Sequence, residues 1–180
     1  MLNLSPIIVK LADAQSEFLC AADAIPAEDW SRKPSAKEWS AAEVSAHLVI
    51  VERAIIRTAD RILHKPPKPV RLWKRLHLPL WLVEVRLLRF KTPIPQDPEL
   101  IGSKEEMLGE VRLTRERAVA FLVETRNRNL SAYRWNHAFL GKLNLYEWFE
   151  MIAAHQLRHA KQMKDIGRRL PKVVEISQNQ

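Results

Sequence analysis

The strongest constraint on the fold is a helical periodicity of apolar residues that recurs in four stretches of the sequence. Apolar residues spaced three or four positions apart form one face of a helix, and that face has to be buried against a neighbouring element. Four amphipathic helices of about 20 residues each predict an all-α fold of the four-helix bundle type. The stretches run from residue 5 to residue 25, from 40 to 62, from 103 to 122, and from 144 to about 167.

Each stretch begins with a signal for the start of a helix. Ser5 precedes a proline, which predicts an N-cap residue followed by proline at the first helical position. Asn144 is expected to cap the fourth helix in the same way, and we expect that helix to end near Gly167. The other two starts have the form of a capping box, in which a serine is followed three residues later by a glutamate: Ser40 with Glu43 and Ser103 with Glu106.

Composition excludes several other classes of protein. Only 4 of the 180 residues are glycine, which disfavours all-β folds rich in tight turns and excludes Gly-rich phosphate loops. Cys20 is the single cysteine, so an intrachain disulfide and a cysteine-ligated metal cluster are excluded. Charged residues interrupt the N-terminal apolar stretch, and no apolar run approaches the roughly 20 residues of a membrane-spanning helix. We therefore expect a cytoplasmic protein with one domain over residues 1–180 and a frayed tail at about 171–180.

The connection between the second and third helices, at about residues 65–102, is too long for a simple loop. Prolines enclose an inner piece at residues 70–90 that is both apolar and basic. We expect this piece to be an extra helix that bends or breaks at Pro79. A connection of this length can cross the whole bundle, so it allows the second and third helices to run parallel.

The net charge of +8 is concentrated in one segment of the sequence. Nine basic residues and one acid lie between Arg61 and Lys91, which leaves the remainder of the chain neutral. We expect this segment to be a lid or a dimer contact that packs on the bundle with its charges outward. One alternative is that the segment forms a helix on an anionic membrane surface, because Trp73 and Trp81 lie among its basic residues. Another alternative is nucleic-acid binding, although the overall charge of the protein does not by itself indicate it.

Three histidines occupy inward-facing helical positions. His155 and His159 are four residues apart, so both rings lie on one face of the fourth helix, where they can reach a single metal ion. His47 lies in the apolar stripe of the second helix. An unpaired polar ring in such a stripe costs free energy. The pattern predicts a metal site of three imidazoles, and the alternative is that each ring is a hydrogen-bonded core or pocket residue.

Other polar and aromatic residues have simpler interpretations. Glu43 lies one turn before His47 and can approach the ion or act as a base, but we favour its role in the capping box. His137 precedes the fourth helix, where it either lines the mouth of the site or serves as a surface or capping group. We expect Trp39, Trp148 and Met151 in the core, Arg158 in a surface ion pair, and no nucleophilic role for Cys20.

Two motifs resemble those of the DinB-like family, which is the DinB/bacillithiol-transferase superfamily of metal-binding four-helix bundles. The first has the form W-S-x-x-E-x-x-x-H-L and covers residues 39–48, and the second has the form H-x-x-R-H-x-x-Q and covers residues 155–162. Residues 137–143 and 147–148 add to the resemblance, although Ala138 stands where family members often carry proline. The resemblance implies an up-down-down-up bundle, a divalent ion on His47, His155 and His159, and a homodimer.

A divalent ion on three neutral imidazoles keeps its charge and acidifies what enters its open positions. Water activated in this way gives a hydrolase, and a low-molecular-weight thiol gives an S-transferase that attacks a small electrophile. The resemblance favours the thiol at least as strongly as water. The identity of the metal stays open, because imidazole suits zinc, nickel, iron and manganese alike. We assign no further catalytic residue, and the alternative function is a non-catalytic metal-binding module of a stress response.

Overall fold

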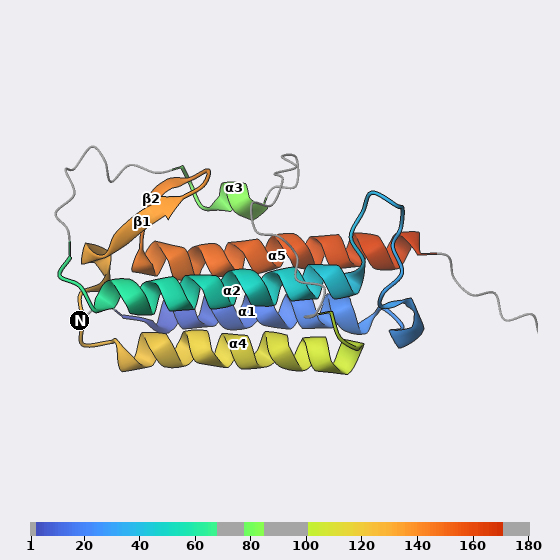
Figure 1. Cartoon of the computed structure of the whole chain (residues 1–180), viewed down its shortest axis with the longest axis horizontal. Helices are drawn as coiled ribbons and strands as arrows, with labels where there is room; N and C mark the ends of the chain where they lie inside the picture. The colour runs from blue at the N-terminus through green and yellow to red at the C-terminus, as the bar shows by residue number, and fades with distance from the viewer. Residues whose placement is uncertain (1–2, 68–77, 85–100, 171–180) are drawn as a thin grey trace, which may run out of the picture.

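The computed structural model describes residues 3–67, 78–84 and 101–170. Within them the fold is mainly helical, and four long helices lie side by side along the long axis of the molecule (Figure 1). The ribbon colours show that two of these helices run in one direction and two in the other. The most extensive packing joins α1 to α5 and α2 to α4. The four helices are α1 (Ser5–Asp23), α2 (Ala41–Leu63), α4 (Lys104–Glu124) and α5 (Leu145–Arg169).

The predicted helix starts are confirmed at three of the four helices. Ser40 and Glu43 form a complete capping box at the start of α2, and Ser103 and Glu106 form one at the start of α4. Asn144 caps α5, and Glu147 completes a capping box there as well. The expected cap at Ser5 is wrong, because Ser5 is already helical and Leu4 occupies the N-cap position without a side-chain hydrogen bond.

A small antiparallel hairpin departs from the all-α prediction. Strands β1 (Arg134–His137) and β2 (Gly141–Asn144) pair in register, with His137 opposite Gly141. A three-residue turn joins them, and Gly141 has a φ of 94°, a conformation that glycine adopts without strain. The Trp135 ring stacks on Trp148 of α5 with centroids 4.4 Å apart, so tertiary packing holds these four-residue strands in place.

The described part of the connection between α2 and α4 packs on the bundle. It contains the short helix α3 (Trp81–Glu84), which lies against α5. The backbone N–H of Leu78 donates to the carbonyl of Leu140 in the hairpin turn at 2.9 Å. Arg158 of α5 donates to the carbonyl of Val83 at 3.4 Å. The remainder of the helix predicted at residues 70–90 lies outside the described residues.

A buried ion pair crosses the centre of the bundle. The Arg115 guanidinium on α4 donates to both carboxylate oxygens of Glu52 on α2, at 2.9 and 3.1 Å. It also donates to the side-chain oxygen of Gln156 on α5 at 2.6 Å and to the carbonyl of Leu11 on α1 at 2.7 Å. Burial raises the pKa of the Glu52 carboxyl, and the Arg115 charge opposes that shift. One side chain therefore connects all four long helices, and most of the other buried residues are hydrophobic.

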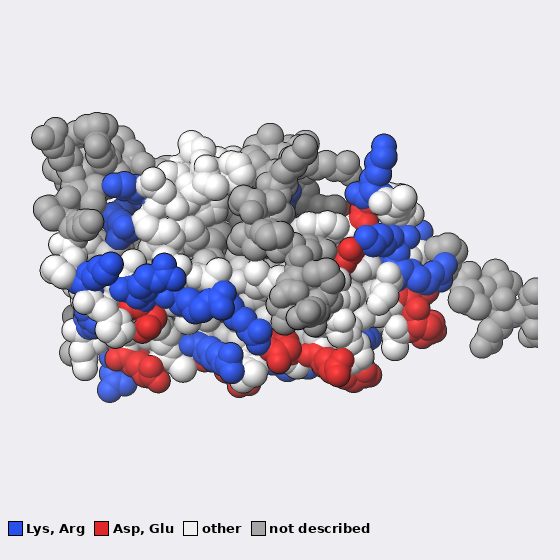
Figure 2. Space-filling view, viewed as in Figure 1, with Lys and Arg blue, Asp and Glu red and all other residues white. Residues whose placement is uncertain are grey.

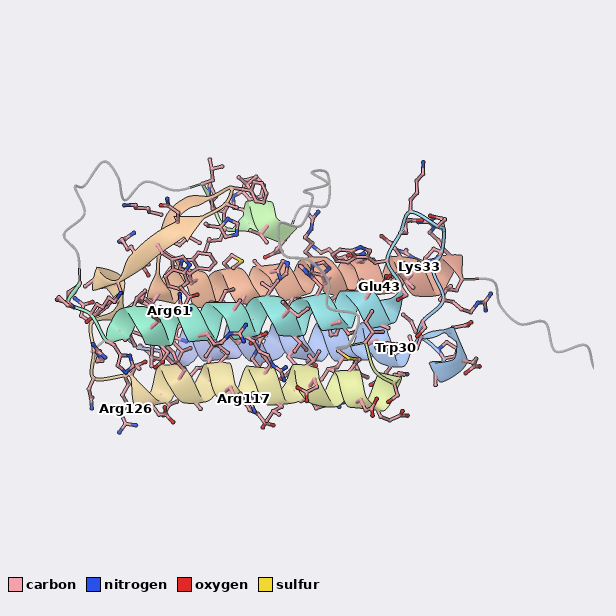
Figure 3. All side chains as sticks on the ribbon, in the orientation of Figure 1. Trp30, Lys33, Glu43, Arg61, Arg117 and Arg126 are labelled. Atoms are coloured by element: carbon pink, nitrogen blue, oxygen red, sulfur yellow. The ribbon has the colours of Figure 1, made fainter. Side chains whose placement is uncertain are left out.

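Surface charge follows the direction of the helices. Figure 2 shows Lys and Arg gathered over the half of this face where α2 and α4 end, and Figure 3 labels three of them, Arg61, Arg117 and Arg126. Acidic side chains Glu105 and Glu106 lie in the first turn of α4. The acidic residues in the first turn of α4 match the positive partial charge of a helix N-terminus, and Arg61 in the last turn of α2 matches the negative partial charge of a C-terminus. Among the described residues, no helix has the length and apolar character that crossing a membrane requires.

Two short 3-10 helices complete the secondary structure of the described residues. One, Ala27–Asp29, follows α1, and the other, Leu130–Ala132, lies between α4 and the hairpin. Buried Trp30 follows the first, and buried Leu130 lies in the second. Both helices therefore contribute side chains to the core at the ends of the bundle.

Candidate metal site

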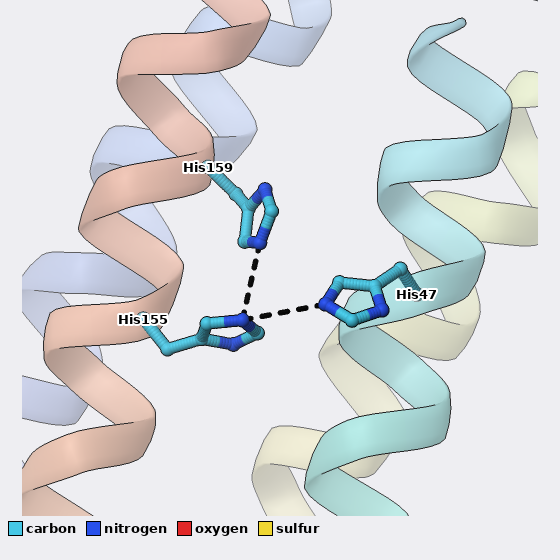
Figure 4. Close-up of side chains that lie close together, drawn as sticks. All are labelled: His47, His155 and His159. Carbon is cyan, nitrogen blue, oxygen red and sulfur yellow. Dashed lines mark hydrogen bonds between the residues drawn. The ribbon is translucent and has the colours of Figure 1, made fainter. Parts of the chain in front are cut away.

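The structure brings together the three histidines that the sequence singles out. His47 comes from α2, whereas His155 and His159 come from successive turns of α5, and the three rings point toward one another (Figure 4). The Nε2 atom of His155 lies 3.3 Å from Nε2 of His47 and 3.1 Å from Nε2 of His159. One ligand atom from each ring lies within 4.8 Å of the others. Histidines 108 positions apart in the chain thus form one cluster.

Hydrogen bonds among the three rings cannot satisfy all of their ring nitrogens. A neutral ring nitrogen has either one N–H or one lone pair, so Nε2 of His155 cannot bond well to both neighbours at once. A cation at the centre would accept all three lone pairs. Adjacent imidazole nitrogens lie about 3.3–3.4 Å apart around a tetrahedral ion with 2.0–2.1 Å bonds, and about 3.0 Å apart at right angles around an octahedral ion. The two spacings at His155 fit adjacent positions in either geometry, and the ligand atoms of all three rings lie within 4.8 Å of one another.

Burial keeps the rings of His47 and His155 in the neutral form that a metal requires. The side chains of His47 and His159 are buried, with 5% and 6% of their surface exposed, whereas His155 is partly exposed. Burial lowers the pKa of His47 to about 4. Burial also lowers the pKa of His155 well below its usual value, and positive charge on His159 and His47 lowers it further. The rings of His47 and His155 are therefore neutral near pH 7, with their lone pairs available.

Two further residues surround the cluster. The Nδ1 atom of His159 lies 2.8 Å from the side-chain oxygen of Gln162, which accepts its hydrogen and leaves the lone pair on Nε2. The Trp39 ring stacks on His159 with centroids 6.5 Å apart and lies 5.1 Å from the ring of His47. Trp39 is half-buried and packs against the hydrophobic core, as expected, and its ring also forms a wall beside two of the histidines.

Glu43 performs the capping role that the sequence favours. Its carboxylate accepts from the backbone N–H of Ser40 at 2.8 Å and pairs with Lys33 at 2.7 Å. Figure 3 shows Glu43 and Lys33 at the beginning of α2. The candidate metal group found among the described residues contains the three histidines without Glu43.

The other candidates occupy several different environments. His137 is half-buried in the hairpin, where its Nδ1 atom accepts from the backbone N–H groups of Phe139 and Leu140, both at 3.2 Å. This confirms a capping role. Trp148 and Met151 are buried as expected, and Cys20 is exposed on α1. Arg158 is half-buried and donates to the Val83 carbonyl.

Sequence analysis did not identify the roles of Gln162 and of the Arg115–Glu52 pair. Gln162 follows His159 by three residues, a spacing that places it beside that ring on a helix. The contact of Gln162 with His159 could therefore have been predicted from this spacing. Arg115 and Glu52 are 63 positions apart, and charged residues at this separation carry no local pattern that predicts their pairing.

Comparisons with known proteins agree with the motifs. The family model described as the DinB superfamily matches residues 10–163 of the chain. The uncharacterized protein YuaE of Bacillus subtilis (strain 168) is 28% identical over 146 residues, which cover 79% of this chain and 86% of that protein. No solved structure matches the chain significantly.

Proposed function

Because the chain belongs to the DinB superfamily, we propose that it is a metal-dependent enzyme in which His47, His155 and His159 hold one divalent ion. The enzyme activates a low-molecular-weight thiol or water for attack on a small electrophile. The observation that carries this proposal is the convergence of three Nε2 atoms from two helices. Their spacing suits an ion, and the rings alone cannot satisfy one another.

The chain's own residues supply a neutral, oriented and partly open site. The three imidazoles are neutral donors, so they hold an ion without cancelling its charge. Gln162 orients the His159 ring through its Nδ1–H. His155 is partly exposed, whereas the other two rings are buried. When bound, the ion lowers the pKa of an adjacent thiol or water and so supplies a nucleophile near neutral pH.

The proposal includes an up-down-down-up arrangement of the four long helices. Figure 1 supports it, because the ribbon colours run in the same direction along α2 and α4 and in the opposite direction along α1 and α5. The long connection after α2 is consistent with a return along the bundle. This arrangement puts His47 on a helix that faces α5.

Metal content tests the site. We expect purified protein to contain about one ion per chain by elemental mass spectrometry, as a mononuclear three-histidine site requires. His155→Ala should lose the ion, because it removes the ring that contacts both others. His64→Ala is the matched control, since His64 is an exposed histidine at the end of α2. Equal metal content in wild type and His155→Ala would refute the site.

Reaction with a model electrophile tests the chemistry. Thiol consumption with a chloro-dinitrobenzene or an epoxide should depend on the metal and disappear in His155→Ala. Hydrolysis of an activated ester without thiol consumption would favour the hydrolase instead. Full metal occupancy with neither reaction would favour the non-catalytic metal-binding module over an enzyme.

A further inference from the structure

The hairpin holds the ring of His137 in one tautomer. Its Nδ1 atom accepts hydrogen bonds from the backbone N–H groups of Phe139 and Leu140, both at 3.2 Å. A ring nitrogen that accepts cannot carry the hydrogen, so the neutral ring has its hydrogen on Nε2. The backbone of the turn therefore makes Nε2 of His137 a fixed hydrogen-bond donor.

This donor is available to a ligand. Among residues 3–67, 78–84 and 101–170, the hydrogen bonds of His137 are the two to Nδ1, and no group accepts from Nε2. The atom is also absent from the buried polar atoms that lack a partner in this part of the chain, and His137 as a residue is half-buried. Trp148 and Phe139 pack around the ring, with centroids 5.2 and 6.1 Å away.

His137 lies on the side of α5 that carries the metal-site histidines. Its ring rests against Trp148, which precedes His155 by seven residues on α5. Seven residues are two helical turns, so Trp148 and His155 share one face and are about 10 Å apart along the axis. Burial lowers the pKa of His137, and its charge is among those that lower the pKa of His155. The two rings are therefore within electrostatic reach of each other.

The described part of the long connection lies on the same side. Leu78 is hydrogen-bonded to Leu140, directly beside the turn that holds His137. Five residues later, the carbonyl of Val83 accepts from Arg158, which is adjacent to His159 in sequence. Residues 78–84 thus connect the hairpin turn with the part of α5 that carries the histidine cluster.

We propose that Nε2–H of His137 binds a carboxylate oxygen of the thiol whose sulfur is held at the three-histidine site. This inference rests on the proposed function, and it specifies the substrate as a small thiol that carries a carboxylate. A neutral imidazole with a fixed N–H stabilises an oxygen anion without giving up its proton. Hydrogen bonds to a charged acceptor are also the stronger ones. Among the described residues, the candidate metal group consists of three histidines, so it has no carboxylate that would repel such a ligand.

Two substitutions separate the two nitrogens of the ring. His137→Asn places an acceptor at the position of Nδ1, so it keeps the hydrogen bonds of the turn and removes the Nε2 donor. His137→Gln places an amide N–H₂ at the position of Nε2, so it keeps a donor and loses the acceptor of the turn. A structural role for His137 predicts that the Gln variant is the more damaged, and a role in ligand binding predicts that the Asn variant is.

The experiment measures thiol binding to full-length protein loaded with Co²⁺, by the absorption of the cobalt–thiolate pair. A series of mercaptocarboxylates of two to five carbons is compared with methyl-ended alkanethiols of the same lengths. At one length we expect the carboxylate to tighten binding about 10-fold over its methyl-ended partner, the usual scale for a hydrogen bond to a charged group. His137→Asn should lose that advantage, His137→Gln should keep part of it, and both should bind Co²⁺ as wild type does.

Each other outcome has a separate meaning. If no carboxylate advantage appears at any length, or if His137→Asn retains it, the inference is overturned while the metal site stands. If Co²⁺ binds and no thiol changes its spectrum, thiol activation fails, and this inference falls with it. If Co²⁺ does not bind to wild type, the three-histidine site itself fails.

Discussion

Arg115 on α4 and Glu52 on α2 are joined by two hydrogen bonds, at 2.9 and 3.1 Å, in the interior of the bundle. Both side chains are buried, with 3% and 6% of their residue surface exposed. The same guanidinium also donates to Gln156, which follows His155 directly in α5. The pair therefore fixes α2 and α5, the two helices that carry the histidine cluster, relative to α4.

Removal of Arg115 should destabilise the protein strongly. Arg115→Met leaves the buried Glu52 carboxylate without its partner, and we expect the free energy of unfolding to fall by about 3–5 kcal/mol. Urea unfolding at pH 7, followed by helical circular dichroism, measures this. Arg117→Met is the matched control, because Arg117 is exposed on the same helix and its loss should cost about 0.5 kcal/mol or less. Equal losses in the two variants would mean that the ion pair contributes little.

Gln162 should tune the affinity for metal without being a ligand. Gln162→Leu removes the acceptor of the His159 Nδ1 hydrogen, and we expect metal affinity to fall about 10- to 100-fold. Gln162→Glu keeps an acceptor at the same position and should retain most of the affinity. Competition with a chromogenic chelator measures both. Equal affinities for wild type and Gln162→Leu would show that the hydrogen bond does not orient the ring.

Metal-free protein should lose stability as the pH falls from neutral. Burial lowers the pKa of folded His47 to about 4, from the ordinary histidine value of 6.5. A lowered pKa means that the unfolded state takes up the proton first, so stability is complete above pH 6.5 and falls toward pH 4. His47 alone should account for about 2 kcal/mol of loss at pH 5.

Unfolding in urea with a chelator present, at pH 7 and pH 5, measures this loss. His47→Gln should lose less stability than wild type between the two pH values, because its side chain does not titrate. The exposed residue His64 provides the control, and His64→Gln should behave as wild type does. An identical loss in all three proteins would assign the pH dependence to groups other than His47, of which His155 is the next candidate because burial lowers its pKa as well.

Added metal should stabilise the folded state through the histidine cluster. At a free ion concentration 100 times the dissociation constant, binding to the folded state adds about 2.7 kcal/mol. Thermal unfolding with and without Zn²⁺ or Ni²⁺ should show a higher midpoint for wild type and for His64→Ala, and no change for His155→Ala. A similar shift in His155→Ala would place the bound ion elsewhere.

Helix positions could be predicted from the sequence because their signals are local. The capping boxes at Ser40 and Ser103 and the cap at Asn144 are confirmed, since a cap depends on residues within one turn. The hairpin was not predicted, because strands of four residues have little periodicity of their own. Stacking of Trp135 on Trp148, a tertiary contact, holds the hairpin on α5.

The four long helices and the inward positions of His47, His155 and His159 can be predicted from the sequence, because periodicity and spacing along one helix are local properties. How those positions meet depends on tertiary packing. The 3.3 Å approach of His47 to His155 depends on how α2 packs against α5, and the Arg115 contacts that fix this packing join residues as many as 104 positions apart. Such contacts form when apolar faces from the whole chain are buried together, so no single segment encodes them.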